Sequence, residues 1–243
     1  ESRGIGDVYK RQAKSQEEMD AHLAKVDQSS VGTNWGVGDI MYADLDGDGK
    51  ISNGTNKLGD TGDYRIIGNS TPRFKYGITL DAAWKGFDFS IFMQGIGKRD
   101  LWLDGCYFWG ANGQGNEWQS TGFAEHWDFF RPEGDPLGAN LNSYYPRVNF
   151  SGDRNTKVQT RYLQNGAYLR LKNVQLGYTL PRVWTEKAGI SSVRVYVSGD
   201  NLATITSLSK IFDPEATGSL AGTGSGKLYP LQRVISVGVN VNF

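Results

Sequence analysis

The sequence predicts an all-β protein whose antiparallel strands alternate apolar and polar side chains, and three observations support this prediction. Glycine accounts for 32 of the 243 residues, aromatic residues for 12% and hydrophobic residues for only 38%. This composition favours many short strands joined by long turns over a helical protein. Several segments repeat apolar residues with a period of two, the period of a half-buried strand. The connections between these segments are alternately short and long.

The overall charge excludes one class of partner. The chain carries 26 basic and 26 acidic residues, and no basic stripe is present that would contact successive phosphates, so we expect no nucleic-acid partner. Cys106 is the only cysteine, which excludes an internal disulfide and a cysteine-based metal site. No window contains about 18 consecutive apolar residues, the length of a membrane helix. Barrel strands need only about 9 to 11 residues and alternate their faces, so a mean hydropathy of -0.47 is compatible with a barrel.

The first residues differ in character from the rest. The chain begins with Glu1 rather than Met, and no charged start followed by an apolar signal core is present. The opening resembles translated sequencing-adapter read-through of the kind found at the ends of environmental gene fragments. We therefore expect residues 1–11 to be an assembly artefact, residues 12–243 to be the protein's own sequence, and the natural start to be missing.

The segment 13–28 is polar and places Met19, Leu23 and Val26 at helical spacing, which predicts a short surface helix. We expect His22 in this helix to be solvated. The first strand is predicted from Phe74 to Trp84. Its apolar face consists of Phe74, Tyr76, Ile78, Leu80, Ala82 and Trp84.

A tight turn at Trp84 to Gly86 leads into a second run, from Phe87 to Gln94, which predicts a hairpin. The stretch from Ile96 to Arg161 has the composition of a long outer loop, and loops of this length usually have a function. Its aromatic residues are Trp102, Tyr107, Phe108, Trp109, Trp118, Phe123, Trp127, Phe129 and Phe130.

Three more strands follow. The apolar positions of the segment 167–180 slip by one between Leu171 and Val174, which predicts a β-bulge. Alternation resumes at residues 193–198, and the final strand, 231–243, alternates throughout and ends on Phe243. Long connections precede the first strand (about 43–72), follow the hairpin and precede the last strand, whereas those at 84–86 and 181–190 are short. Short turns on one rim and long loops on the other are typical of an outer-membrane barrel, although a soluble β-domain has similar strands.

Several blocks of the sequence resemble the successive C-terminal blocks of SusC/RagA-type TonB-dependent outer-membrane transporters, in the same order. They are QEE at 16–18, GDIMYADLDGDGKI at 38–51, RIIGN at 65–69, KGFD at 85–88, YLRLKNVQLGY at 168–178, VYVSGDNL at 195–202 and the final strand. The resemblance implies a C-terminal portion, about five or six strands, of a 22-stranded outer-membrane β-barrel, with long outer loops and the short N-terminal helix.

The family also implies a function and partners. These are nutrient import into a Gram-negative cell, an oligosaccharide or peptide substrate, a SusD-like surface lipoprotein, outer-membrane lipid, and a TonB complex that acts through the missing N-terminal region. On this interpretation the chain alone is not competent for transport. The alternative is a calcium-stabilised cell-surface β binding module. We expect no enzyme, because only His22 and His126 are available as bases near neutral pH and no serine or cysteine stands in a nucleophile motif.

The loop from 44 to 63 has a calcium-type pattern. Asp44, Asp46 and Asp48 take positions one, three and five, Gly49 provides the turn at six, and Lys50 offers its carbonyl at seven. Oxygen ligands of this kind suit Ca²⁺ in a structural role. At position twelve the pattern has Thr55 in place of an acid. The family pattern instead implies a closing acid just before the RIIGN block, and we assign it to Asp63, with Asp60 as the substitute and Ser52 as a hydroxyl or water-mediated contact. A tight aspartate turn with no ion remains the alternative.

Overall fold

The structure is a computed structural model that describes residues 3–55, 57, 59–113, 115, 122–152, 154–217 and 228–243. The chain divides into two compact units, which we describe separately. Unit 1 comprises 1–70, 100–164 and 217–228, and unit 2 comprises 71–99, 165–216 and 229–243. Trp118, one of the aromatic residues of the predicted outer loop, lies outside the described residues.

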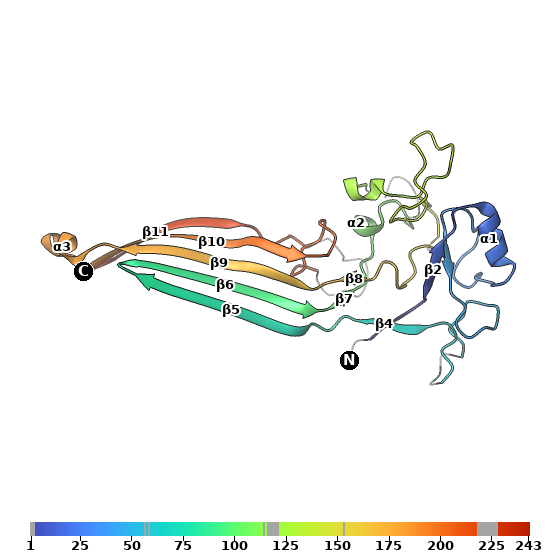
Figure 1. Ribbon diagram of the computed structural model, residues 1–243, viewed down its shortest axis with the longest axis horizontal. Coiled ribbons are helices and arrows are strands. Elements are labelled where there is room, and N and C mark those ends of the chain that lie inside the picture. The colour runs from blue at the N-terminus through green and yellow to red at the C-terminus, as the bar shows by residue number, and fades with distance from the viewer. Residues whose placement is uncertain are drawn as a thin grey trace. The chain divides into compact units, whose positions relative to one another are not determined.

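Unit 2 is a five-stranded antiparallel sheet (Figure 1). Its strands are β5 (Arg73–Trp84), β6 (Phe87–Lys98), β9 (Tyr168–Thr179), β10 (Ser192–Thr206) and β11 (Val234–Asn242). Their order across the sheet is β11-β10-β9-β6-β5, so β5 and β11 are the edge strands. The predicted antiparallel strands are therefore confirmed.

The register of this sheet follows from short turns at one end. Lys85 and Gly86 both have positive φ, 46° and 86°, and close the two-residue turn between β5 and β6. A helix α3 (Arg182–Thr185) and a 3-10 turn η3 (Glu186–Ala188) connect β9 to β10. The register of β6 against β9 shifts between Phe92 and Met93, so Lys172 is the extra residue and the predicted bulge is confirmed. A second register shift, in β10 after Asp200, was not predicted.

Unit 1 contains short strands and one longer helix. Its elements before the sheet are β1 (Arg3–Gly6), β2 (Tyr9–Gln12), α1 (Gln16–Leu23), β3 (Ile40–Tyr42) and β4 (Arg65–Asn69). Strand β1 pairs with β4, and β2 pairs with β3. Strand β1 and most of β2 lie within residues 1–11. The interpretation of these residues as sequencing-adapter read-through stays a prediction.

The N-terminal helix forms as predicted, but one of its residues is placed differently. Ser15 caps α1 by accepting the N–H of Glu18, and Met19 packs fully buried in a small core with Ala13 and Met41. The expectation that His22 is solvated is wrong: it is 5% exposed. The Gln28 side chain packs against it, with Oε1 at 3.1 Å from His22 Nε2, so the imidazole has a polar partner inside the fold.

The described part of the stretch from 96 to 161 is mostly irregular, and several of its aromatic side chains pack on one another. Strand β6 continues to Lys98, and the later elements are β7 (Asp100–Leu101), α2 (Cys106–Trp109), η2 (Ala124–Trp127) and β8 (Gln164–Asn165). Phe108 and Trp109 are buried, and their rings contact that of Tyr162 edge to face, with the Trp109 and Tyr162 centroids 4.7 Å apart. These rings form an aromatic cluster in the interior of unit 1. Among the described residues, no helix has the length and apolarity needed to cross a membrane.

Candidate functional site

One face of the five-stranded sheet is apolar across all its strands. Because paired residues point to the same side of a sheet, the register defines rows of side chains that cross it. One row consists of Ala82, Phe89, Leu176, Val197 and Val237. Another consists of Leu80, Ile91, Val174, Gly199 and Ile235. Most of these side chains are exposed, up to 76% at Val237, so a large apolar surface has no partner within unit 2.

The opposite face of the same sheet is polar. The row between the two apolar rows consists of Asp81, Ser90, Gln175, Ser198 and Ser236. On the same face, Arg194 donates from Nε to Asp88 Oδ1 at 2.9 Å and from Nη2 to Asp88 Oδ2. Gly177 leaves room for this ion pair, because a Cβ there would lie 2.5 Å from both side chains. The sheet therefore separates an apolar face from a hydrogen-bonded polar one.

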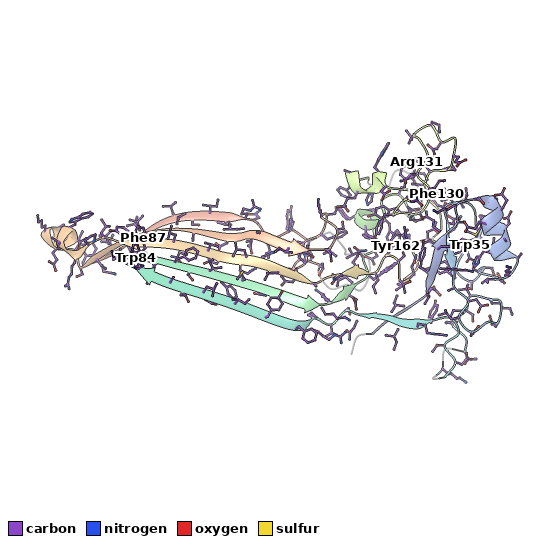
Figure 2. All side chains as sticks on the ribbon, viewed as in Figure 1. Trp35, Trp84, Phe87, Phe130, Arg131 and Tyr162 are labelled. Atoms are coloured by element: carbon purple, nitrogen blue, oxygen red, sulfur yellow. The ribbon has the colours of Figure 1, made fainter. Side chains whose placement is uncertain are left out.

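Aromatic side chains gather at the short-turn end of the sheet. The Phe87 and Tyr178 rings lie 4.6 Å apart, and the Lys85 ammonium group lies 4.8 Å from the Trp84 ring. Figure 2 shows Trp84 and Phe87 together at this end, where the C-terminus also lies (Figure 1). Trp84 is 69% exposed and Phe243 90% exposed. Aromatic girdles of this kind border the apolar band of transmembrane barrels.

The acidic loop brings three of the predicted ligands together. One carboxylate oxygen each from Asp44, Asp46 and Asp48 lies within 4.8 Å of the others. Backbone N–H groups shape this arrangement: those of Gly47 and Gly49 donate to the two oxygens of Asp44 at 2.6 and 2.9 Å. The three acids are partly or fully exposed, and exposed acidic groups also occur without an ion.

The closing acid assigned from the sequence lies against this loop. Asp63 is fully buried, and its carboxylate accepts the N–H of Leu45 at 2.6 Å and that of Ser52 at 2.8 Å. Asp63 therefore links Leu45, near the beginning of the loop, to Ser52, at the ninth position of the calcium-type pattern. The substitute, Asp60, is bound elsewhere, because its Oδ2 accepts both the N–H and the hydroxyl of Thr55 at 3.1 and 2.6 Å.

The electrostatics of the loop favour a cation. The pKa of the Asp46 carboxyl lies above its ordinary value: the N–H of Asp48 lowers it, but desolvation and the charges of Asp48, Asp63 and Asp44 together raise it by more. The neighbouring carboxylates thus disfavour the charged form of Asp46, and a divalent cation would offset their effect. Each oxygen keeps a lone pair beyond its backbone hydrogen bond. Lys50 donates its N–H to Asp48 at 2.8 Å, and the role of its carbonyl as a ligand stays a prediction.

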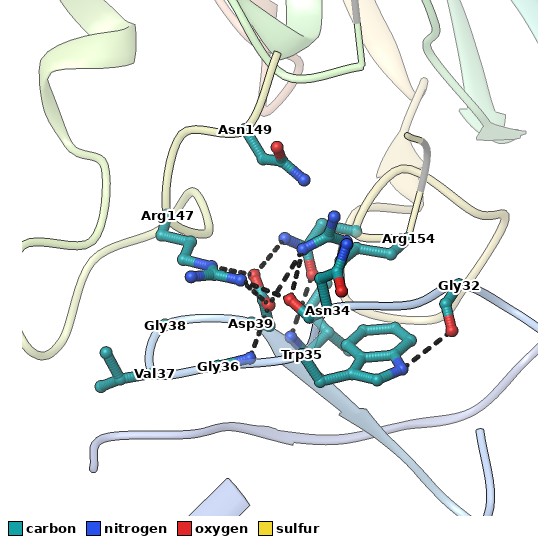
Figure 3. A network of polar contacts seen from close by, with 12 residues as sticks. Gly32, Asn34, Trp35, Gly36, Val37, Gly38, Asp39, Arg147, Asn149 and Arg154 are labelled. Atoms are coloured by element: carbon teal, nitrogen blue, oxygen red, sulfur yellow. Dashed lines mark hydrogen bonds and ion pairs between the residues drawn. The ribbon is translucent and has the colours of Figure 1, made fainter. Parts of the chain in front are cut away.

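A buried aspartate that the sequence did not single out holds the segment leading into this loop (Figure 3). Asp39 immediately precedes β3, is fully buried, and forms a bidentate ion pair with Arg147 at 2.7 and 2.6 Å. Asn155 donates to the same carboxylate at 2.8 Å. Gly38 is required beside it, because its φ is +83° and a Cβ would lie 2.3 Å from the Phe130 ring.

No short-range signal reveals this network. Arg147 and Asn155 lie 108 and 116 residues from Asp39, in a stretch predicted only as a long loop. The GD pair at 38–39 was part of a family block, but nothing near it in the sequence indicated a partner. The network therefore emerges only once the fold is known.

Comparisons with known proteins agree with these features. No family model matches the chain. It is 33% identical over 216 residues to TonB-dependent receptor P3 of Formosa agariphila, an alignment that covers 85% of this chain and 19% of that receptor. It is 30% identical over 240 residues to TonB-dependent receptor P26 of the same organism, covering 95% of this chain and 21% of that receptor. The chain thus spans about a fifth of the length of these curated relatives.

Solved structures give the same result for the fold. The RagAB peptide importer in its open-open state matches with a TM-score of 0.66 at 21% identity, over 99% of this chain and 22% of that chain. The structure of the RagAB peptide transporter matches with a TM-score of 0.65 at 22% identity, over 99% of this chain and 23% of that chain. The likeness extends over the antiparallel strands and the irregular segments together. This chain is therefore a homologue of the TonB-dependent receptors, with the fold of part of a RagAB chain.

Proposed function

We propose that this chain supplies adjacent strands of the C-terminal portion of a 22-stranded barrel, in a TonB-dependent nutrient importer of a Gram-negative outer membrane. In this proposal the apolar face of the sheet contacts lipid and the polar face lines the interior. The strands, nine to fifteen residues long, match the length that crosses an outer membrane.

The main support for the proposal is that rows of apolar and polar side chains, each crossing all five strands, alternate along the sheet. A continuous apolar surface of this kind is unfavourable in water. In a bilayer the same surface contacts the apolar lipid tails, which is not unfavourable. The edge strands β5 and β11 have no further partner among the described residues. Unpaired backbone groups cost several kcal/mol each in hydrocarbon, so both edges require neighbouring strands supplied by the rest of the barrel.

The substrate and partners belong to the whole importer. One of the matched solved structures is described as a peptide importer, which supports a peptide as the substrate, with an oligosaccharide as the other class. A SusD-like surface lipoprotein is the proposed outer partner, because the two long connections, from β6 to β9 and from β10 to β11, both leave the sheet at the end opposite the short turns. Energy coupling to the TonB complex would use a part of the importer outside these residues. The matched relatives are receptors and transporters, which supports import rather than catalysis.

A structural Ca²⁺ ion in the acidic loop is part of the proposal. Asp44, Asp46 and Asp48 would bind the ion, with the Lys50 carbonyl as a further ligand and Asp63 closing the loop. The only role of the ion would be to neutralise the charge of these carboxylates. The support is the gathering of three carboxylates and the raised pKa of Asp46, to which desolvation and the charges of Asp48, Asp63 and Asp44 contribute.

Cell fractionation combined with uptake tests the function. The complete protein that carries this chain is expressed in an outer-membrane host, and uptake of labelled peptide and oligosaccharide mixtures is measured with and without TonB. We expect outer-membrane localisation, heat-modifiable migration on gels and uptake that requires TonB. Recovery of the protein in the soluble fraction as a calcium-binding monomer would contradict the proposal and favour the cell-surface module.

A further inference from the structure

A cavity of about 570 Å³ opens on the polar face of unit 2, at the end of the sheet away from the short turns. Its polar lining includes Arg170, Asn201, Thr204, Lys210, Asp213 and Arg233. Arg170 lies on the polar face of the sheet. It pairs with Gln94 in β6 and Thr204 in β10, and the side chain of Gln94 points to the same side as that of Ser90. None of these residues belongs to the acidic loop or to the apolar face.

Hydrogen bonds hold the Arg170 side chain in place, and one of its donor nitrogens has no partner among the described residues. Its side chain is 4% exposed; Nε donates to Thr204 Oγ1 at 2.8 Å and Nη2 donates to Asp213 Oδ1 at 2.6 Å. Asp213 is fully engaged, because it also accepts the N–H groups of Glu215 and Leu231 at 2.9 Å each. Arg170 Nη1 remains buried without a hydrogen-bond partner among the described residues. A buried donor without a partner is unfavourable, so such groups usually meet a ligand or water.

Asn201 provides a second unpaired group in the same lining. It adopts a left-handed backbone conformation, with φ of 52°, in the irregular part of β10. Its Nδ2 donates to the Gln232 carbonyl at 3.1 Å, which fixes the amide, and its Oδ1 is buried without a partner. Two of the residues that line the cavity therefore each carry one buried polar atom without a partner among the described residues, a cationic donor and an acceptor.

The charges of the lining residues determine which ligand charge the cavity favours. Asp213 is the only carboxylate among the lining residues, and Arg170 already pairs with it. Nearby Glu215 pairs with Lys172 at 2.9 Å, and its Oε1 also lies 3.6 Å from Arg170 Nε. The two carboxylates are thus balanced by Arg170 and Lys172, and the exposed Arg233 adds a further cation to the lining. An anionic group is therefore favoured over a neutral or cationic one.

We propose that this cavity binds a carboxylate-bearing part of the substrate. The carboxylate accepts from Arg170 Nη1, and a neighbouring N–H or O–H of the ligand donates to Asn201 Oδ1. A peptide end and an acidic sugar share this chemistry. The inference rests on the proposed function, because the polar face meets the transported molecule only if it lines the barrel.

Calorimetry on the complete protein in detergent micelles tests the inference with two pairs of probes. N-acetyl-alanine is compared with its amide, and glucuronate with glucose. We expect the carboxylate of at least one pair to bind about tenfold to a hundredfold tighter than its neutral counterpart. Arg170→Gln should abolish this preference. Arg182→Gln is the matched control, because Arg182 lies on α3 with a 76% exposed side chain and should leave the preference intact.

A further variant separates binding from folding. Removal of Arg170 also frees Asp213, so Arg233→Gln is tested as well; it should weaken carboxylate binding several-fold and leave Arg170 in place. A preference within the N-acetyl-alanine pair alone identifies a peptide end, and one within the glucuronate pair alone identifies an acidic sugar. Equal binding of charged and neutral probes by a protein that still shows heat-modifiable migration would overturn the inference alone. A protein that fails to assemble in outer membranes would instead overturn the proposed function.

Discussion

Asp39 and Arg147 lie 108 residues apart in the sequence, and the guanidinium group of Arg147 donates to both carboxylate oxygens of Asp39, at 2.7 and 2.6 Å. This pair joins the segment that leads into the acidic loop to the long stretch between β6 and β9. We expect Asp39→Ala to destabilise unit 1 by about 1–3 kcal/mol, because it removes the acceptor of the half-buried Arg147 and of the buried Asn155. Hydrogen exchange of residues 40–51 measures the effect, and unchanged protection would contradict it.

The two faces of β11 provide a prediction for membrane assembly. Val237 and Ser236 are neighbours with similar backbone geometry, but Val237 lies in an apolar row and Ser236 in the polar row. Val237→Arg should reduce assembly in outer membranes, since an arginine facing lipid near the midplane costs about 2–4 kcal/mol. Ser236→Arg is the control and should assemble nearly normally. Heat-modifiable migration on gels reports the assembled fraction, and equal assembly of both variants would count against a lipid-facing side.

The acidic loop gives a prediction for calcium. We expect the complete protein to bind Ca²⁺ with a dissociation constant of about 0.1–1 mM, as in extracellular calcium modules. Asp46→Ala combined with Asp48→Ala should abolish binding, because it removes two of the three gathered carboxylates. Asp63→Asn should weaken binding, whereas Asp60→Asn should not, since Asp60 is directed at Thr55. Calorimetry measures all four proteins. Binding retained by the double variant would remove the site.

The Arg170–Asp213 pair predicts a pH dependence. Desolvation raises the pKa of Asp213, but hydrogen bonds from Arg170, Glu215 and Leu231 and the charge of Arg170 lower it by more, so it lies below its ordinary value of 3.8. The folded state therefore favours the ionised form. The resulting stability is present above about pH 4 and is lost as the pH falls through the depressed value. Hydrogen exchange of residues 207–217, corrected for intrinsic rates, should increase below pH 3.8. Asp213→Asn should lack this transition.

The strands could be predicted from the sequence because their signal is local. Each strand of the sheet carries its own alternation, and even the bulge at Lys172 appears as a slip in phase between Leu171 and Val174. The three aspartates of the acidic loop were likewise found because a calcium-type loop keeps its ligands within a few residues. The family resemblance supplied Asp63, which local spacing alone did not indicate.

The remaining features depend on contacts across long sequence separations. The Asp39 network, the burial of His22 by Gln28 and the cavity at Arg170 each require a partner whose position no local pattern encodes. The second bulge, after Asp200, went unnoticed because Leu202 and Ala203 blur the alternation there. Aromatic residues in the long stretch were visible in the sequence, but which of them pack inside was decided by the fold.

The two-faced sheet is the central claim, and site-specific labelling along β11 tests it most directly. Single cysteines are introduced at positions 235–241 of the complete protein with Cys106 replaced. In one sample each thiol carries a fluorophore whose quenching is measured in bilayers of brominated lipid, and in a parallel sample the free thiol reacts with a water-soluble maleimide. We predict strict alternation: positions 235, 237, 239 and 241 quenched by lipid, and 236, 238 and 240 labelled by maleimide. Uniform maleimide labelling at all seven positions would contradict the account.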